Sequence, residues 1–370
     1  MRPFADHRNV VVTGASLAGH DWPLALSAGG YERGPAGLTI ARKPVTGNHG
    51  AGAALDACAD WRPELTAMSR AITAMEEQFS MSGELTLDVY VSNYKPIPGD
   101  PAVMSEGQAT WPASSVSLLS GKRDAVLIDA LITIDEARQA AEWIRAKGKR
   151  LTTIYITHGH GDHIFGLNTL LAAFPGARAV ALAEVMPAIR SQVTPGNLEF
   201  WGALFPGQIP EQPVLPEALD GNVIDLEGHE LRLISVGQSD TYPSTVVHVP
   251  DLEAVVGGDV CYNQIHVWLA LTNHDARLAW IDTIGKIEAL APRIVVAGHK
   301  APGTPDDDLA ELIAGTRQYI IDFDEAERVS SSREELVGKM LAAHGDRGNL
   351  YSLWAAATAA FSARDEKSSL

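Results

Sequence analysis

Cysteine is scarce in this chain of 370 residues, which has only Cys58 and Cys261 and no C-x-x-C pair. A disulfide framework is therefore not indicated, as is usual for proteins of the reducing cytoplasm. Long apolar runs are missing too, because no stretch approaches the roughly 18 apolar residues of a membrane-spanning helix. The start of the chain lacks the basic region and apolar core of a secretory signal. We therefore expect a cytoplasmic protein that binds no membrane.

Positive charge is also in short supply. The chain has 29 Lys and Arg against 46 Asp and Glu, a formal net charge of −17, and no basic run offsets this excess. Nucleic acid is not expected as a partner, because its binding requires a basic surface. Hydrophobic residues make up 46% of the chain, which is ample for a well-buried core. The composition indicates a globular protein whose partner is a small-molecule substrate.

Residues 1–80 lack the hydrophobic periodicity of helices and strands for most of their length. The segment Val10–Ser16 is similar to the first strand and glycine turn of short-chain dehydrogenases, but the glycine spacing fails a few residues later. The next domain also begins too soon for a Rossmann sheet to be completed. We interpret residues 1–80 as an irregular, poorly ordered N-terminal extension, either an upstream-start extension before Met81 or a loosely attached arm.

The most informative motif is the run His158-Gly159-His160-Gly161-Asp162-His163. Its three imidazoles and one carboxylate supply nitrogen and oxygen donors for a divalent metal ion of the zinc class. The apolar stretch Leu151–Ile156 before it predicts a strand, and Ile164–Phe174 after it predicts a helix that ends at Pro175-Gly176. The donors therefore stand on a strand-to-helix loop, where open sheets expose chemistry. Surface histidines without a metal are the alternative, which the alternation of ligands around a tight glycine turn disfavours.

This H-x-H-x-D-H motif resembles that of the metallo-β-lactamase fold superfamily, and the resemblance covers about residues 84–300. The superfamily has three further metal ligands in order along the chain. Asp259 follows the apolar strand Ala254–Val256 and a glycine pair, and His299 follows the strand Ile294–Ala297 and a glycine. Gln238 follows a strand and a glycine at the position where the superfamily usually has histidine.

Two metal positions follow from the resemblance. It assigns the first metal to His158, His160 and the residue at 238, the second metal to Asp162, His163 and His299, and the bridging position to Asp259. Gln238 offers only an amide oxygen, which is a weaker donor than imidazole. Two interpretations stay open: Gln238 or the nearby Asp240 completes the first site, or Gln238 contacts the ligands or the substrate and the first site is weak or empty. We expect one or two Zn²⁺ ions, with Mn or Fe as alternatives.

The remaining pattern is that of an α/β protein. Alternation predicts strands at Leu85–Val91, Ser115–Leu119 and Ala125–Asp129, and Asp135 is expected to cap a helix that runs to about Lys147. A four-layer αββα sandwich over residues 81–303 accounts for these elements, with two sheets face to face and helices outside. Helical apolar spacing after residue 304 predicts a C-terminal helical extension, residues 304–370, that packs on this domain.

Two segments are expected to shape the substrate pocket. Pro187–Pro216 is rich in proline and carries Trp201 among its aromatic residues, so we predict a structured loop that acts as a lid or as a sealing or dimer-contact patch. Tyr262, His266 and Trp268 follow the bridging aspartate closely and are candidate substrate-binding residues. A single histidine is more often a satisfied structural side chain than a functional one, which also applies to His266.

A zinc-class ion lowers the pKa of bound water towards about 7 and polarises the oxygen of the group under attack. The resemblance therefore implies a metal-dependent hydrolase that uses a metal-bound hydroxide on a small carbonyl substrate, such as an ester, lactone, thioester, amide or β-lactam. Asp162 is the candidate catalytic carboxylate, as a ligand or as the acceptor of the water's proton. The alternatives are a mononuclear iron oxygenase of sulfur compounds and a catalytically silent binding protein.

A first prediction concerns residues 1–80, whose sequence is irregular. Deletion up to Met81 should leave the unfolding transition and the turnover of the remaining chain unchanged, because a segment without periodicity contributes little to a core. Thermal unfolding and kinetics of the truncated chain test this. Loss of folding or of turnover would show that the segment is a structural part of the protein.

Overall fold

The computed structural model describes residues 31–33, 39–41, 85–99, 104 and 109–368 of the chain. The chain divides into two units, Met1–Met75 and Glu76–Leu370. In the first unit, β1 (Tyr31–Arg33) and β2 (Thr39–Ala41) pair antiparallel. The rest of the predicted N-terminal extension lies outside the described residues. The second unit carries all the elements described below.

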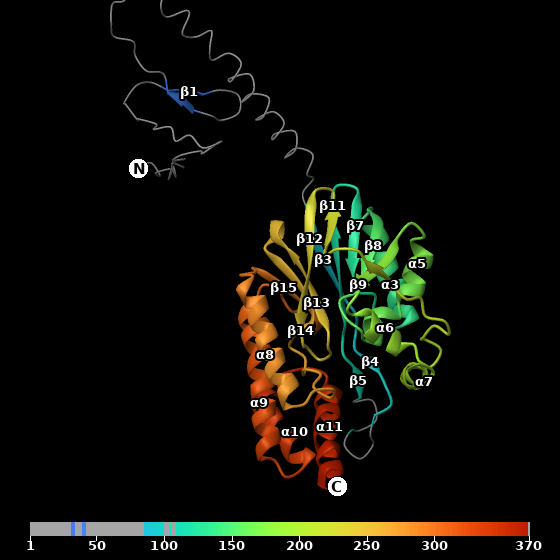
Figure 1. Ribbon diagram of the computed structural model, residues 1–370, viewed down its shortest axis with the longest axis vertical. Helices are drawn as coiled ribbons and strands as arrows, with labels where there is room; N and C mark the ends of the chain where they lie inside the picture. The colour runs from blue at the N-terminus through green and yellow to red at the C-terminus, as the bar shows by residue number, and fades with distance from the viewer. Residues whose placement is uncertain (1–30, 34–38, 42–84, 100–103, 105–108, 369–370) are drawn as a thin grey trace, which may run out of the picture. The chain divides into compact units, whose positions relative to one another are not determined.

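Two β-sheets form the centre of the second unit (Figure 1). The first sheet has six strands in the order β10-β9-β8-β7-β6-β3, and the second has five in the order β11-β12-β13-β14-β15. Pairing is parallel from β7 to β10 and between β14 and β15, and antiparallel elsewhere in both sheets. The strands are β3 (Thr86–Val91), β6 (Ser115–Ser120), β7 (Asp124–Ile128), β8 (Arg150–Tyr155), β9 (Arg178–Leu182), β10 (Glu217–Leu219), β11 (Val223–Leu226), β12 (His229–Gly237), β13 (Ser244–Val249), β14 (Ala254–Asn263) and β15 (Ile294–Lys300), with a short pair formed by β4 (Lys95–Pro96) and β5 (Thr110–Trp111).

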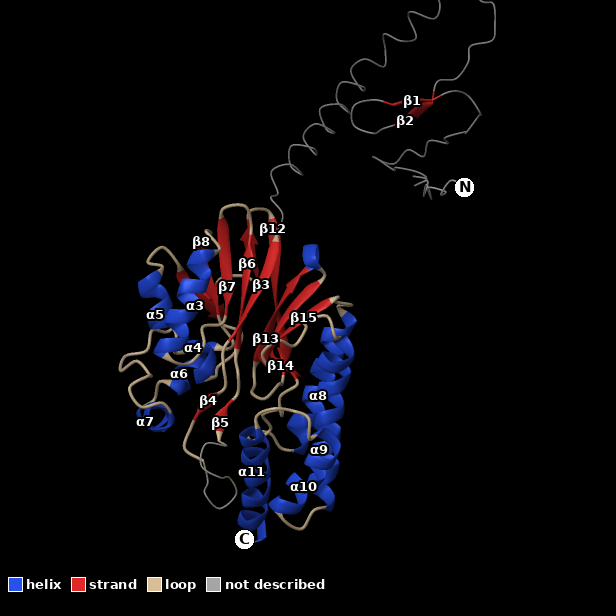
Figure 2. Ribbon diagram, turned by 180° about the vertical axis from the view of Figure 1, so that it is seen from behind, coloured by secondary structure: helices blue, strands red, loops and turns tan. Residues whose placement is uncertain are grey.

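Helices cover the outer faces of both sheets, α3 and α5 on the first and α8 and α9 on the second (Figure 2). The αββα arrangement expected from the sequence is therefore confirmed, and so are the C-terminal helices. No helix among the described residues is long and apolar enough to cross a membrane. The helices are α3 (Ile134–Ala146), α4 (Gly161–Ile164), α5 (Leu167–Ala173), α6 (Met186–Gln192), α7 (Pro195–Leu204), α8 (His274–Ala289), α9 (Thr316–Val329), α10 (Arg333–His344) and α11 (Leu350–Ser368), with a 3₁₀ turn at Pro250–Leu252 and a π-helical turn at Ala310–Gly315.

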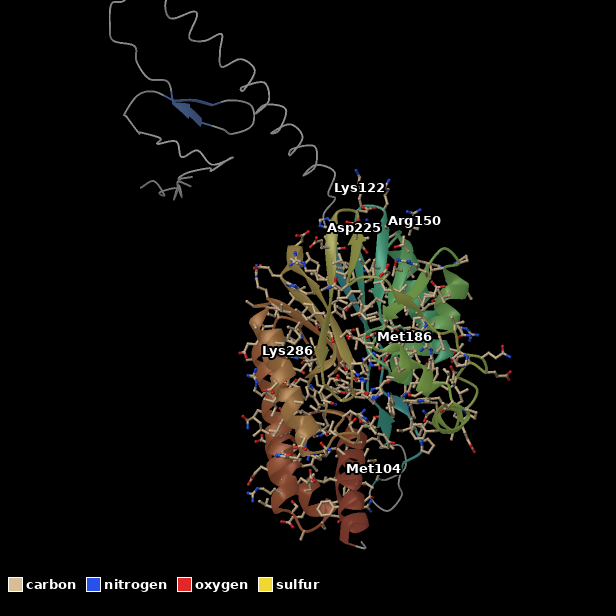
Figure 3. All side chains as sticks on the ribbon, viewed as in Figure 1. Met104, Lys122, Arg150, Met186, Asp225 and Lys286 are labelled. Carbon is tan, nitrogen blue, oxygen red and sulfur yellow. The ribbon has the colours of Figure 1, made fainter. Side chains whose placement is uncertain are left out.

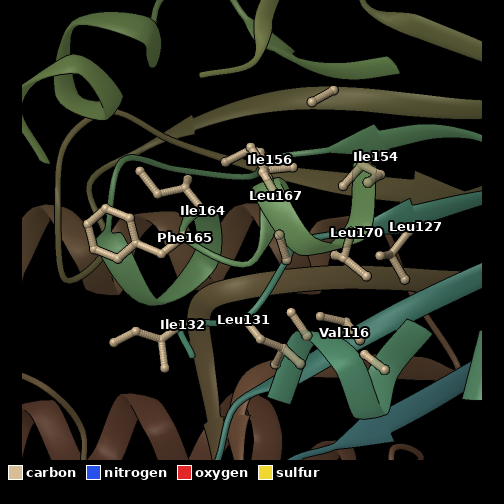
Figure 4. Close-up of a cluster of buried hydrophobic side chains, with 14 of the residues drawn as sticks. Val116, Leu127, Leu131, Ile132, Ile154, Ile156, Ile164, Phe165, Leu167 and Leu170 are labelled. Atoms are coloured by element: carbon tan, nitrogen blue, oxygen red, sulfur yellow. The ribbon is translucent and has the colours of Figure 1, made fainter. Parts of the chain in front are cut away.

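Alternation along the strands divides the apolar side chains between the layers. In β7, Val126 and Ile128 belong to the core between the two sheets, and Leu127 belongs to the cluster beneath the helices. Figure 4 shows Leu127 and Ile154 of the first sheet beside Leu170 of α5. Because side chains of a strand point alternately to its two faces, each central strand contributes to two cores at once. This is why strands such as β7 are apolar at successive positions.

The C-terminal helices share a core with the second sheet. Trp280 of α8, Tyr319 and Phe323 of α9 are fully buried beside Val255 and Val295 of the sheet. The indole nitrogen of Trp280 donates to a backbone carbonyl of β14 at 3.0 Å, so its one polar atom is satisfied inside the core. α8 and α9 therefore form an outer layer on the second sheet, while α10 packs on α9 and α11, and α11 also contacts β5.

Charged turns fasten the sheets together at one end. Glu227, in the β11–β12 turn, accepts hydrogen bonds from the backbone nitrogens of Lys122 (2.6 Å) in the β6–β7 turn and of Asp124 (3.1 Å) at the start of β7. Lys122, Arg150 and Asp225 lie at this end in Figure 3. Because the parallel strands β7 and β8 begin here, their carboxyl ends lie at the opposite end. The loop with the metal-ligand motif therefore emerges away from this charged end.

The start of α3 differs from its prediction. Thr133, not Asp135, is the N-cap: its hydroxyl accepts from the backbone nitrogen of Glu136, and the Glu136 carboxylate accepts from the backbone nitrogen of Thr133. This reciprocal capping box satisfies two helix-end donors, which Asp135 inside the first turn does not do. Gly148 follows the helix with a φ of 68°, as its place after a helix end predicts.

The proline-rich segment is also more regular than predicted. The sequence predicts a loop over Pro187–Pro216, but the segment contains most of α6 and all of α7. Pro187 and Pro195 both stand in the first turn of their helix, where the backbone nitrogen has no partner to lose and the fixed φ of proline suits the helix. Prolines therefore start these two short helices, while still excluding one long helix.

A close backbone approach interrupts the helix predicted over Ile164–Phe174. The segment forms α4 and α5, and Gly166 lies between them, with its nitrogen donating to the carbonyl of Leu131 at 3.1 Å. A Cβ atom on Gly166 would lie 1.9 Å from the carbonyl oxygen of Ala130. The loop that follows β8 is thus held directly against the loop that follows β7.

This contact generates a second prediction. Gly166→Ala should lower the free energy of unfolding by about 1–3 kcal/mol, because two backbone segments must separate to admit the methyl group. Gly202→Ala is the matched control, since Gly202 is inside α7 and its Cβ would meet nothing within 4 Å. That variant should be neutral or stabilised by up to ~1 kcal/mol through helix propensity. Equal urea-unfolding midpoints for both variants would refute the argument.

Candidate metal centre

Three of the four segments that carry candidate ligands follow or end a strand. β8 runs into the loop with His158 and His160, β15 contains His299 near its carboxyl end, and β12 ends at Gly237, directly before Gln238. Asp259 lies within β14, where the pairing with β15 shifts register between Gly258 and Tyr262. Isolated bridges, His158 with Ser244 and Ser114 with His299, join the two sheets beside these residues.

The side chains form two adjacent donor groups. Within each group the donor atoms lie within 4.8 Å of one another. Asp259 connects the groups, because its Oδ1 is 3.3 Å from His163 Nε2 and its Oδ2 is 3.2 Å from His299 Nε2. The first group is His158, His160, Asp240 and Asp259, and the second is Asp162, His163 and His299.

Several buried polar atoms at this centre make no hydrogen bond. They are Nε2 of His158, Nε2 of His163, Oδ2 of Asp240 and Oδ1 of Asp259. Buried polar groups in proteins nearly always have a partner, and unpaired buried charges are costly. These atoms instead face one another within the donor groups, which is the arrangement that a shared cation requires. Imidazole and carboxylate donors are those of zinc-class ions, so the residues present fit the metal that the motif predicts.

Asp129 orients two of the imidazoles, and sequence analysis assigned it no role. Its Oδ2 accepts from His163 Nδ1 at 2.9 Å, and its Oδ1 accepts from the backbone nitrogen of Thr157 at 2.9 Å. The Thr157 hydroxyl donates to Asp129 and therefore accepts from His158 Nδ1, at 2.9 Å. Both rings then present Nε2 to the centre. In metal-binding histidines the ring orientation is commonly fixed in this way, by a carboxylate or hydroxyl that accepts from the other ring nitrogen. Its position directly after β7, beside the motif strand β8, was the available signal.

Other contacts fix the remaining ligands. His299 Nδ1 donates to the carbonyl of Ala113 at 3.2 Å, which leaves its Nε2 facing the centre. The indole nitrogen of Trp111 donates to Asp162 Oδ2 at 2.9 Å. The hydroxyl of Tyr262 donates to Asp259 Oδ2 at 3.1 Å, so this residue positions the Asp259 carboxylate.

Burial and mutual charge set the protonation states. Burial lowers the pKa of His158 to about 3, so its ring is neutral and carries a free lone pair at neutral pH. Burial also opposes protonation of His299, but Asp259 and Asp162 outweigh it and raise its pKa to about 10. Burial disfavours ionised Asp162, yet His163 and His299 hold its pKa below the usual range. A cation that binds here would displace the proton from His299, so binding should strengthen as pH rises.

The sequence left open whether Gln238 or Asp240 completes the first donor group, and the side-chain positions distinguish the two. The Gln238 side-chain nitrogen donates to the carbonyl of Ser239 at 2.9 Å. Asp240 is 1% exposed, its Oδ1 accepts from the Ser239 hydroxyl, and its Oδ2 lies 2.9 Å from His160 Nδ1. This geometry favours Asp240 over Gln238 as the donor that completes the first group.

A pocket with about 200 Å³ of room opens beside the donor groups. Trp268, one of the candidate substrate-binding residues, is among its lining residues. Tyr262 and His266 are not: Tyr262 is fully buried behind Asp259, and His266 Nδ1 is 3.0 Å from the hydroxyl of Tyr319. Burial lowers the pKa of His266 to about 4, which fits a neutral structural histidine. From the proline-rich segment, Gln192, Asn197, Phe200 and Trp201 line the pocket, together with His160, Asp162, Asp240, Asp259 and His299 of the centre.

Comparison with known proteins identifies the family. The sequence profile of the metallo-beta-lactamase superfamily matches residues 109–299, just over half of the chain. The chain therefore belongs to the metallo-beta-lactamase superfamily. The matched span begins just before Trp111 and ends at the last candidate ligand, His299.

Curated relatives resemble shorter parts of the chain. It is 35% identical over 78 residues to the hydroxyacylglutathione hydrolase of Vibrio campbellii and 42% identical over 67 residues to that of Francisella tularensis subsp. novicida. These matches cover 20% and 18% of this chain and 31% and 25% of the two relatives. The chain thus matches about a third or less of their length.

Similar solved structures include two metallo-beta-lactamase proteins. A metallo-beta-lactamase from Pontibacter korlensis has 17% sequence identity and a TM-score of 0.46, with 65% of this chain and 100% of that chain covered. A metallo-beta-lactamase family protein from Thermus thermophilus has 19% identity and a TM-score of 0.49, with 76% of this chain and 94% of that chain covered.

The alternative between Asp240 and Gln238 gives a third prediction. Asp240→Asn should lower first-site metal affinity about 10- to 100-fold, because a charged donor is lost while the shape is kept. Gln238→Ala is the matched control and should keep the metal content of the unmodified protein. Metal per chain, measured by mass spectrometry after dialysis against limiting zinc, distinguishes them. The reverse result, with loss in Gln238→Ala alone, would make Gln238 the ligand.

Proposed function

We propose that the protein is a metal-dependent hydrolase of small carbonyl substrates, with a dinuclear centre. The observation that carries the proposal is the pair of buried donor groups joined by Asp259, in which donor atoms of histidine and carboxylate crowd together within 4.8 Å in each group. His158, His160, Asp240 and Asp259 would hold the first ion, and Asp162, His163, His299 and Asp259 the second. When bound, a zinc-class ion polarises a carbonyl oxygen and lowers the pKa of water.

The protonation states support a ligand role for Asp162. Burial disfavours its charged form, but His163 and His299 keep its pKa below the usual range, so it is a weak base at neutral pH. A general base works best with a pKa near the working pH, and the neighbouring histidines shift the pKa of Asp162 in the opposite direction. We therefore assign Asp162 to holding a cation, with Trp111 fixing one of its oxygens.

The pocket supports a small substrate. It offers about 200 Å³ of room beside Asp162, Asp240, Asp259 and His299, so a carbonyl group can reach the centre while water is largely displaced. The partial similarity to hydroxyacylglutathione hydrolases agrees with ester or thioester cleavage as the reaction class. Because the similarity covers only about a third or less of the relatives' length, it supports the reaction class, and the substrate has to be inferred from the pocket.

Metal removal tests the proposal. Protein treated with a chelator should lose turnover of ester, thioester and lactone substrates and regain it with Zn²⁺ or Mn²⁺. His299→Ala should lower kcat/KM by at least about 100-fold and lower metal content, because a ligand of the second ion is lost. His248→Asn, a change on β13 away from the centre, is the control and should keep both. Full activity of the metal-free protein would overturn the proposal.

A further inference from the structure

The wall of the pocket is aromatic and uncharged. Beyond the carboxylates and histidines of the centre, it is formed by Trp111, Trp201, Trp268, Phe200 and Leu271, with a proline and two amides. None of the described residues that line it is Lys or Arg. A ligand that enters therefore meets hydrocarbon surface on the wall and charge only at the floor.

The aromatic residues pack as one preformed cluster. Trp111 is 5% exposed, and its ring centroid lies 5.1 Å from that of Trp201 and 5.3 Å from that of Trp268. Trp201 in turn packs edge-on against Phe165 at 5.9 Å. Rings held by such neighbours lose little freedom when a ligand binds, so the cluster is a ready surface for another apolar group.

Two of the three indole nitrogens in the wall, and one of its amide groups, already make hydrogen bonds. The indole nitrogen of Trp111 donates to Asp162, and that of Trp201 donates to Gln192 Oε1 at 3.2 Å. The amide nitrogen of Asn197 donates to the carbonyl of Ser191 at 2.7 Å. A ligand in the pocket therefore meets the faces and edges of these rings more than free hydrogen-bond donors.

The mouth of the pocket is apolar as well. Phe200 is 49% exposed and Leu271 is 65% exposed, and both line the pocket. Phe200 comes from α7, and Leu271 comes from the segment between β14 and α8, so the two sit on separate parts of the chain. Large apolar side chains exposed at a concave site mark a surface that binds an apolar ligand.

We propose that this pocket selects uncharged substrates whose acyl group carries an aromatic ring or a bulky apolar group, with that group against Trp111, Trp201 and Trp268. The inference rests on the proposed hydrolase function. A glutathione arm carries two carboxylates, and the wall offers them no side-chain cation. The formal charge of −17 further opposes the approach of anions.

Matched thioesters of N-acetylcysteamine test the substrate class. Hydrolysis joins water to the carbonyl carbon, breaks the C–S bond and releases a carboxylic acid and a thiol, which a thiol reagent detects. The phenylacetyl thioester should have a kcat/KM at least about tenfold above that of the acetyl thioester. It should exceed the 4-carboxyphenylacetyl thioester by a similar factor, because only charge is added to the same ring.

Variants at the rim locate the effect. Leu271→Ala and Phe200→Ala should each reduce the preference for phenylacetyl over acetyl, seen mainly in KM. Leu271→Arg should shift the preference towards the carboxylated substrate by about tenfold, because it supplies the missing cation. Leu278→Ala, which removes a side chain that is also 49% exposed but lies on α8 outside this pocket, should leave the ratios unchanged.

Binding separates this inference from the hydrolase proposal. Phenylacetone and its 4-carboxy derivative cannot be hydrolysed, and calorimetry with the metal-loaded protein should show tighter binding of the uncharged ketone. If no ester, thioester or lactone is cleaved but this order of binding holds, the hydrolase proposal fails and the pocket's selectivity stands. If substrates are cleaved but the carboxylated ligands bind and react as well as the uncharged ones, the inference is wrong and the hydrolase proposal stands.

Discussion

The concentration of buried charge at one end of the two sheets is the constraint on which the site depends. His158, Asp162 and Asp259 are at most 3% exposed, so water screens little of their interaction. Removing a carboxylate from water costs on the order of several kcal/mol unless it is paired with an opposite charge. Protonated His163 and His299 supply part of the compensation, and a cation shared by the donor groups would supply more. The surrounding structure holds these charges together.

Contacts between the sheets provide that hold. The Thr157 carbonyl, in the motif loop, accepts from the backbone nitrogen of Thr245 in β13 at 3.1 Å. On the other side, the Ser115 hydroxyl of β6 donates to the carbonyl of Ala297 in β15 at 2.6 Å, two residues before His299. Each sheet is therefore tied to the other next to the ligands it carries. A centre built from both sheets keeps its geometry only if they cannot slide, and these bonds prevent sliding.

How far the sequence predicts this site depends on how local each signal is. The motif from His158 to His163 is visible in the sequence because its donors are contiguous, whereas Asp259 and His299 were indicated by the resemblance to the superfamily, each after an apolar strand and a glycine. Asp240 could not be separated from Gln238, because hydrogen bonds between Ser239 and each of these side chains decide which one turns inward. Periodicity indicated the strands and several helices, and the resemblance to the superfamily implied how they are arranged. The short helices α6 and α7 were missed because proline is a loop signal unless its place in a first turn is known.

Trp111 links the chemistry of the centre to the selectivity of the pocket. Its nitrogen fixes an oxygen of Asp162, and its ring forms the middle of the aromatic wall. A substrate group that displaces this ring would also disturb Asp162, so the wall cannot adapt freely to bulkier or charged groups without changing the donor groups. Apolar substrates that bind without moving the Trp111 ring leave the Asp162 carboxylate in place. The same side chain thus restricts both the position of a carboxylate and the shape of what approaches it, and substrate range is more readily altered at the exposed rim than at Trp111.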